Sequence, residues 1–144
     1  MPKRKQKPDQ EALILKNQLA RALADYDNLS KRVERENAEM HIRVTARVVR
    51  QLLPVFDMVS DTQRHLKDAG LAMAMAQLIE SLKALGIEQI KAEPGMAFDE
   101  ALHEAVDSVD DEKRKAGEIV SVALSGWKFV EGPVIRHAKV VVRR

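Results

Sequence analysis

Cysteine is absent from this chain of 144 residues. A disulfide framework, a thiolate nucleophile and a Cys-ligated zinc or iron–sulfur site are therefore excluded. Aromatic residues are also scarce, because Trp, Tyr and Phe together make 3% of the chain whereas charged residues make 32%. Bulky rings supply much of a compact core. A chain poor in rings but rich in Ala, Leu, Val, Lys and Glu is instead typical of elongated helices.

Long apolar runs are missing as well. No stretch approaches the roughly 20 residues needed to span a bilayer, and no apolar segment follows the basic N-terminus. We therefore expect neither a membrane helix nor a secretory signal, and with the lack of cysteine this predicts a cytoplasmic protein. The apolar fraction of 45% is nevertheless normal for a folded chain, and the length suits one ordinary domain.

The net charge of +2 is unevenly distributed along the chain. Lys3, Arg4, Lys5 and Lys7 lie within the first eight residues, which hold no acid, while the remaining residues carry a small excess of acid. We interpret residues 1–9 as a basic disordered arm. A nucleic-acid partner would require a basic face on the body of the protein, and the sequence shows none.

A single long helix is predicted for residues 10–53, because residues 9–53 contain neither Gly nor Pro. Such a stretch would be a rod of about 68 Å at ~1.5 Å per residue. A compact monomer of this size is only about 40 Å across. The helix must therefore extend beyond any such globule, and its apolar stripe needs a partner.

The apolar stripe of this helix follows the a/d spacing of a coiled-coil seam. Past residue 33 the heptad fails, since Glu36 and Arg43 fall on seam positions, and an eleven-residue repeat continues, which relaxes the left-handed supercoil. We predict a homodimer in which two nearly straight helices lie side by side, while the alternative is one amphipathic helix packed on its own domain. The predicted dimer interface comprises Leu15, Leu19, Ala22, Tyr26, Leu29 and Val33.

Short bundle helices are predicted for residues 54–92. Pro54 should break or kink the long helix, because proline lacks a backbone donor and restricts the residue before it. Asp68-Ala69-Gly70 indicates a tight connection, and Gly86 should end the last helix. Two short helices make only half a bundle, so two copies would form a four-helix bundle.

The last third, residues 93–144, has the character of a small β-rich domain. Strand-like runs occur at 119–124, 127–129, 134–135 and 140–142, and Gly132-Pro133 indicates a turn. The predicted fold class is α+β, with a long dimeric helical stalk, short bundle helices and a small C-terminal β-domain.

Residue patterns that support catalysis are missing. The four histidines are far apart in the sequence, and none forms a helical pair that could hold a metal. There is no Gly-rich phosphate loop and no nucleophile elbow. The acidic run Asp110-Asp111-Glu112 adjoins three basic residues and suits a solvated loop. We therefore predict no catalytic residue, no metal and no cofactor, and thus not an enzyme.

Several motifs, in order along the chain, make it resemble the GrpE family. The resemblance runs from about Leu13 to Val142 and combines motifs that are weak singly. It is carried by the long-helix segment 24–32, by Leu52-Leu53-Pro54-Val55-Phe56-Asp57, by Leu85-Gly86-Ile87-Glu88-Gln89-Ile90, by Phe98-Asp99, by Leu102-His103-Glu104-Ala105-Val106, by Gly126-Trp127 and by Ile135-Arg136.

The GrpE resemblance implies a nucleotide exchange factor, or co-chaperone, for a DnaK-type heat-shock chaperone. It further implies a homodimer in which one protomer's β-domain enters the nucleotide-binding region of the chaperone ATPase domain and favours its open cleft, so that ADP leaves. Such a factor needs no catalytic side chain, since it must only bind the open form better than the closed one.

The resemblance carries three chaperone-binding residues over to this chain: Gly70, Trp127 and Arg136. A plain helix–helix turn remains an alternative for Gly70, and packing in the β-domain core is the favoured alternative for Trp127. Arg136, a charge on a short strand, is the best candidate for a direct contact. Phe98, Asp99 and His103 are expected to tie the start of the β-domain together, where a helix-capping Asp99 with His103 at i+4 is as plausible as a binding role.

Other functions stay open on the sequence alone. A nucleic-acid-binding coiled coil could use the basic arm, although such proteins carry more bases along the helix. A scaffold whose β-domain binds another partner shares every physical feature above. The long helix, with few aromatics and with charges near its seam, is also expected to melt before the β-domain and so to act as a thermosensor.

Overall fold

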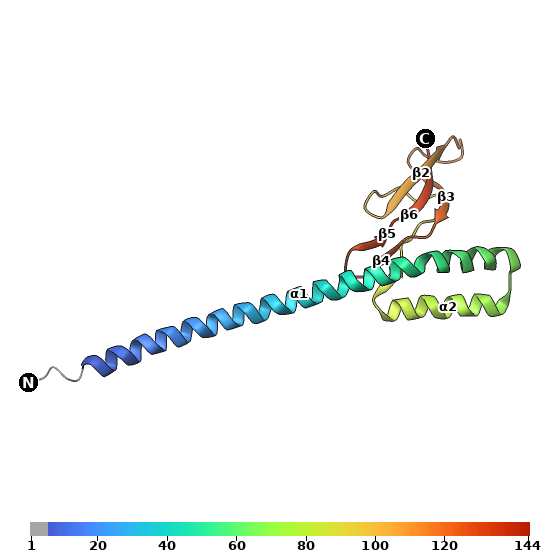
Figure 1. Ribbon diagram of the computed structural model, residues 1–144. Coiled ribbons are helices and arrows are strands. Elements are labelled where there is room, and N and C mark those ends of the chain that lie inside the picture. The colour runs from blue at the N-terminus through green and yellow to red at the C-terminus, as the bar shows by residue number, and fades with distance from the viewer. Residues whose placement is uncertain (1–5) are drawn as a thin grey trace, which may run out of the picture. The chain divides into compact units, whose positions relative to one another are not determined.

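A computed structural model describes residues 6–144 and contains two long helices followed by six strands (Figure 1). The chain divides into two compact units, of which the first ends at Thr45 and the second comprises Ala46–Arg144. Most of the predicted basic arm lies outside the described residues. Helix α1 begins at Gln6, however, so the arm does not extend to residue 9. Pro8 is tolerated there because first-turn N–H groups have no intrahelical acceptor.

Helix α1 spans Gln6–Leu66, which is 61 residues, and confirms a long helix. Ion pairs one turn apart lie on its exposed surface, with Lys31 Nζ 2.7 Å from Asp27 and Arg32 Nε 2.8 Å from Glu36. The hydrogen bond and the charge of Glu36 raise the pKa of Arg32 above its ordinary value. Exposed pairs of this kind contribute little to stability. Among the helices of the described part, none is both long and apolar enough to cross a membrane.

Of the two outcomes predicted at Pro54, the break is wrong, because α1 continues through it to Leu66, whereas a kink stays a prediction. Proline removes only one hydrogen bond, the one that residue 54 would donate to the carbonyl of Arg50, at a cost of about 3 kcal/mol. Leu53 and Phe56 are buried on either side of the proline. Each such burial contributes about 1.5–3 kcal/mol, so packing of this face offsets the lost bond.

Helix α2 spans Ala69–Ala84, so a tight connection is present but lies at residues 67–68, and Ala69 and Gly70 already belong to the helix. Lys67 adopts a positive φ of 51°, and the Asp68 carboxylate accepts a hydrogen bond from the backbone N–H of Leu71 at 2.8 Å. This is an N-cap, which satisfies a donor at the helix start. Gly86, with φ of 73°, follows the C-terminal end as predicted.

The strands form two three-stranded sheets. The element bounds are β1 Ile87–Gln89, β2 His103–Val109, β3 Ile119–Leu124, β4 Trp127–Phe129, β5 Val134–Arg136 and β6 Ala138–Arg143. One sheet has the order β1-β4-β5 and is antiparallel, while the other has the order β2-β6-β3, with β2 parallel to β6. Because β1 pairs with β4, the β structure begins at residue 87 rather than 93.

The core of the strand region centres on Ile90, Ile119, Ala138 and Val140. Its close packing depends on Gly126, which joins β3 to β4. A Cβ atom added there would lie 2.3 Å from the backbone nitrogen of Ala138. No side chain larger than hydrogen fits that gap, so Gly126 allows the loop to pass directly against β6.

Candidate functional site

The second unit contains a joint at which α1 meets the small sheet β1-β4-β5. Val49, Leu53 and Phe56 are buried on α1 at the spacing of one helix face. The Phe56 ring stands edge-on to the indole of Trp127, with ring centroids 5.0 Å apart and an interplanar angle of 87°. Edge-to-face aromatic pairs add roughly 0.5–1.5 kcal/mol beyond area burial. The apolar part of the joint is thus a helix face packed against β4.

A polar part of the joint lies beside the aromatic pair. The Arg136 guanidinium donates to both carboxylate oxygens of Asp57, at 2.6 and 2.8 Å. It also donates to the carbonyl oxygen of Ser125, through Nε at 3.1 Å and Nη2 at 2.6 Å. Arg50 Nε donates to the carbonyl oxygen of Ile135 at 3.1 Å. Two arginines therefore link α1 to β5: Arg50 on α1 binds a carbonyl oxygen of β5, and Arg136 on β5 binds a carboxylate of α1.

The ion pair of this joint is largely shielded from water. The exposed fractions of the Arg136 and Asp57 side chains are 17% and 19%. Bidentate, charge-assisted hydrogen bonds are shorter, stronger and more directional than neutral ones. The pair therefore fixes the geometry between helix and sheet more tightly than an exposed pair could.

Trp127, a predicted chaperone contact, is completely buried. This burial favours the alternative, packing in the core, and a contact with the chaperone at this position stays a prediction. Its Nε1 atom has no hydrogen-bond partner among the described atoms. Trp127 positions β4 against Phe56 and does not present a surface.

Arg136 is likewise not the free cation that the sequence suggested. All of its observed hydrogen bonds are made within the chain, to Asp57 and Ser125. Arg136 is thus held at the joint within one chain, and a direct contact with the chaperone stays a prediction. Sequence reasoning missed Asp57 as its partner, although the residue ends the Leu52–Asp57 motif.

Gly70 lies apart from the joint, in the first turn of α2, and is exposed. A Cβ atom there would meet only the Asp68 carboxylate, at 3.2 Å. The structure therefore does not gather Gly70, Trp127 and Arg136 into one surface. A chaperone contact at Gly70 stays a prediction.

The start of β2 is tied together as expected, but by a different local structure. His103 Nδ1 accepts from the backbone N–H of Asp99 at 3.1 Å, and its Nε2 lies 3.0 Å from the Lys91 carbonyl oxygen. The Asp99 carboxylate accepts from the N–H of Ala101 at 2.9 Å. Asp99 therefore stabilises a turn before a strand, and the predicted helix cap is wrong because no helix follows it.

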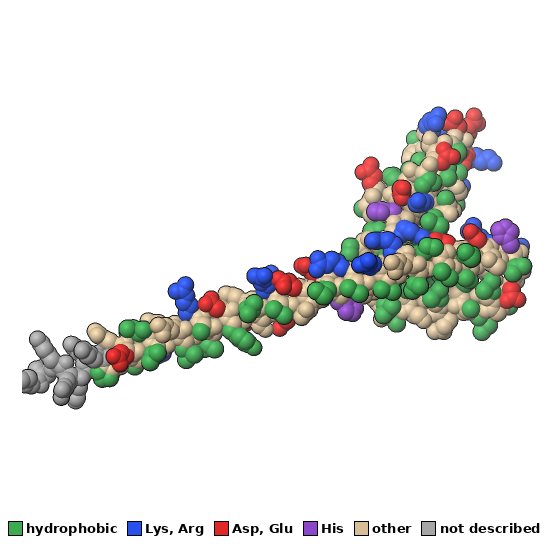
Figure 2. All heavy atoms as spheres, viewed as in Figure 1, with side chains coloured by type: hydrophobic (Ala, Val, Ile, Leu, Met, Phe, Trp, Pro, Cys, Tyr) green, Lys and Arg blue, Asp and Glu red, His purple; other side chains and the backbone are tan. Residues whose placement is uncertain are grey.

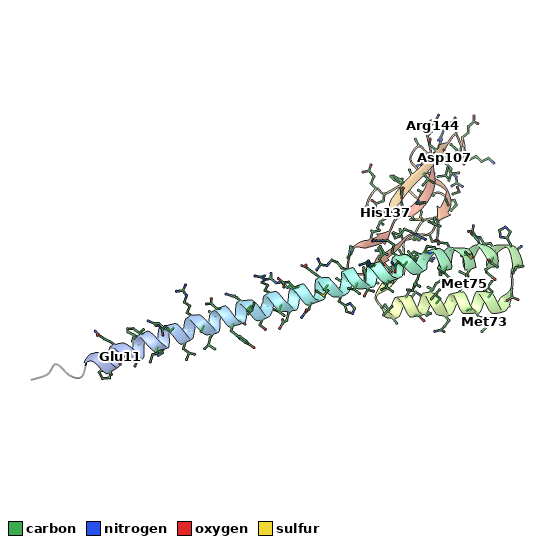
Figure 3. The ribbon with its side chains drawn as sticks, in the orientation of Figure 1. Glu11, Met73, Met75, Asp107, His137 and Arg144 are labelled. Carbon is green, nitrogen blue, oxygen red and sulfur yellow. The ribbon has the colours of Figure 1, made fainter. Side chains whose placement is uncertain are left out.

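The predicted dimer residues are exposed in a single chain. Leu15, Leu19 and Tyr26 are 64%, 60% and 71% exposed. Helix α2 is a second element without cover, since none of its residues is buried within the described part of a single chain. Hydrophobic side chains gather over α2 and the adjoining part of α1 (Figure 2). Met75 points toward α1 whereas Met73 points away from it, and Met73 is 74% exposed (Figure 3). That two chains pair along the predicted seam of α1 stays a prediction.

A small polar cleft of 290 Å³ adjoins the joint, lined by Asp57, Ser60, Asp61 and Arg64 of α1 and by the end of β3. Its carboxylates are already paired, Asp57 with Arg136 and Asp61 with Arg64. Within residues 6–144, no group of three or more His, Asp or Glu could hold a metal ion. The cleft therefore offers no evident chemistry of its own.

The comparison with known proteins decides the family. A family model described as GrpE matches residues 3–144. The chain belongs to the GrpE family. Protein GrpE of Clostridium tetani is 34% identical over 142 residues, which cover 95% of this chain and 70% of that protein. The GrpE proteins of Nitratiruptor sp. and Coxiella burnetii are 34% and 33% identical, over 86% and 88% of this chain and 76% and 66% of their own lengths.

Membership of the GrpE family implies a co-chaperone that promotes nucleotide exchange on a DnaK-type chaperone. A co-chaperone of this family is a nucleotide exchange factor and not a catalyst in the usual sense. The α+β fold, with a long helix before a small β region, is the one that the sequence predicted.

Proposed function

We propose that the chain binds the ATPase domain of a DnaK-type chaperone, favours its open cleft and so accelerates ADP release. The observation that carries the proposal is the GrpE match over residues 3–144. A factor of this kind shifts the conformational equilibrium only by its differential affinity for the two states. About 1.4 kcal/mol of preference for the open form changes the open-to-closed ratio tenfold.

We further propose that the active species is a homodimer. The seam residues Leu15, Leu19, Ala22, Tyr26, Leu29 and Val33 supply an apolar stripe with no cover inside the described chain. Helix α2 supplies a second uncovered apolar surface. Pairing of two chains would cover the stripe as a coiled coil and α2 as a four-helix bundle.

The exchange activity is tested by stopped-flow release of a fluorescent ADP from a bacterial DnaK-type chaperone. Adding this protein at micromolar concentration should accelerate release at least tenfold. The same protein after heat unfolding serves as the control and should have no effect. If the folded dimer leaves the release rate unchanged with several such chaperones, the exchange proposal is wrong and a scaffold function is favoured.

A thermosensing role is part of the proposal. The described part of the first unit is α1 up to Thr45, and there helix hydrogen bonds and exposed ion pairs are the contacts that support the segment within one chain. Most helical stability in proteins comes from packing of an apolar face. The paired segment should therefore melt at a lower temperature than the strand region, and exchange should weaken as it melts.

A further inference from the structure

Two motifs that lie far apart in the sequence meet at the joint. Asp57 ends the Leu52–Asp57 motif of α1, and Arg136 ends the Ile135-Arg136 motif of β5, 79 residues later. Among the ion pairs of the described residues, the others link positions three or four apart or lie within the small sheet, as Lys128 and Glu88 do. The Asp57–Arg136 pair is therefore the ion pair that ties the helix to the strands.

The geometry of the pair resists both rotation and separation. Arg136 uses its planar fork on two oxygens of Asp57 while it also donates to Ser125, so the guanidinium is held from two sides. The Phe56–Trp127 contact lies at the neighbouring position on α1 and supplies an apolar pivot. An aromatic contact alone permits ring sliding, whereas a bidentate pair sets direction.

We propose that Asp57 and Arg136 are positioning residues, a latch that fixes the orientation of the strand region on α1 and thereby sets the fraction of molecules ready to engage the chaperone. This inference rests on the proposed exchange function. Apparent affinity falls in proportion to the fraction of molecules in the competent orientation. Loss of the latch should therefore weaken engagement and leave the maximal exchange rate unchanged.

The first test measures orientation directly and does not depend on a chaperone. Because the chain has no cysteine, spin labels can be placed at Thr62→Cys on α1 and Glu104→Cys on β2, both at exposed positions. Labelled chains are mixed with an excess of unlabelled chains, so that distances within one chain dominate. The unmutated latch should give one narrow distance distribution, and Asp57→Asn should broaden it.

The second test measures ADP release as a function of co-chaperone concentration. Asp57→Asn should raise the half-saturating concentration about tenfold and keep the maximal rate within about twofold. Asp57→Glu, which keeps a carboxylate, should stay within about threefold of wild type. The matched control is Glu88→Gln, which breaks the 3.1 Å pair with Lys128 inside the small sheet and should change neither readout.

A third variant separates the latch from a direct contact of Arg136 with the chaperone. If the two residues act through each other, the double variant Asp57→Asn with Arg136→Gln should be no weaker than the worse single variant. Additive losses would mean that Arg136 has a separate role and would overturn the latch.

A narrow distance distribution in Asp57→Asn would overturn the latch as well, and so would a broad distribution with an unchanged half-saturating concentration. If the wild-type protein fails to accelerate ADP release, the proposed exchange function is wrong, and so is the role of the latch in chaperone engagement. The distance data still decide whether the Asp57–Arg136 pair fixes orientation.

Discussion

At the scale of single residues, Gly126 is the glycine at which an added Cβ atom would make the shortest contact, 2.3 Å from the Ala138 nitrogen. A Cβ atom would overlap the Ala138 backbone, which cannot rotate away as a side chain can. We expect Gly126→Ala to lower the free energy of unfolding by about 3 kcal/mol, as overpacking does. Urea unfolding followed by the fluorescence of Trp127, the chain's one tryptophan, measures this.

The control for this prediction is Gly70→Ala, which makes the same chemical change in the first turn of α2. The nearest atom to the added Cβ is a carboxylate oxygen that can move, and alanine favours helix by up to about 1 kcal/mol over glycine. Its unfolding free energy should stay within about 1 kcal/mol of wild type. Equal midpoints for Gly126→Ala and wild type would contradict the close approach.

The structural role of a single residue could be predicted where the residues that determine it lie close by in the sequence. The Gly86 helix end followed from the sequence because its cause lies within one turn. Core packing of Trp127 was the favoured alternative, but its partner Phe56 and the Asp57 partner of Arg136 did not follow from the sequence, since they come from a segment far away in the chain. The motif ending in Asp57 was visible, but one sequence does not reveal which charge faces it.

At the scale of elements, the behaviour of Pro54 tests why α1 is continuous. Pro54→Ala restores a donor to the Arg50 carbonyl and should stabilise the helix by about 1–3 kcal/mol. Ala38→Pro, at an exposed position of the same helix without buried neighbours, should destabilise it by about 3 kcal/mol. Circular dichroism at 222 nm during thermal unfolding measures both. A less stable Pro54→Ala protein would mean that the packing of the joint requires the proline.

Elements differed in how clearly the sequence predicted them. The strands β3 to β6 were found from β-branched and aromatic runs, while β1 and β2 were missed. Strand β2 contains Glu104 and Asp107 and pairs in parallel with β6, 35 residues away at its start. Its pairing is decided by tertiary contacts rather than propensity. Likewise, burial of Leu53 and Phe56 overrode the local signal of Pro54.

At the scale of the whole molecule, the two chains of a dimer should meet along the predicted seam. Ala22 and Ala24 offer a matched test, because both are exposed on α1 and only Ala22 lies on the seam. Ala22→Asp would place two carboxylates inside the interface, which costs several kcal/mol. We expect its dimer dissociation constant, measured by sedimentation velocity, to rise about 100-fold or more, and that of Ala24→Asp to change less than about threefold. Equal effects of the two variants would place the interface elsewhere.

Heating should separate the two units of the chain. In the proposed dimer the segment up to Thr45 would depend on a partner chain, whereas the strand region has its own core at Ile90, Ile119 and Val140. The helical signal at 222 nm should therefore show a first transition whose midpoint temperature rises with protein concentration, as association requires. The fluorescence of Trp127 should change only at a higher temperature. Ala22→Asp should lower the first midpoint and leave the second in place. One shared, concentration-independent transition would show that the helix and the strands unfold together, and the chain could not then lose its paired helix on heating while keeping the β region folded.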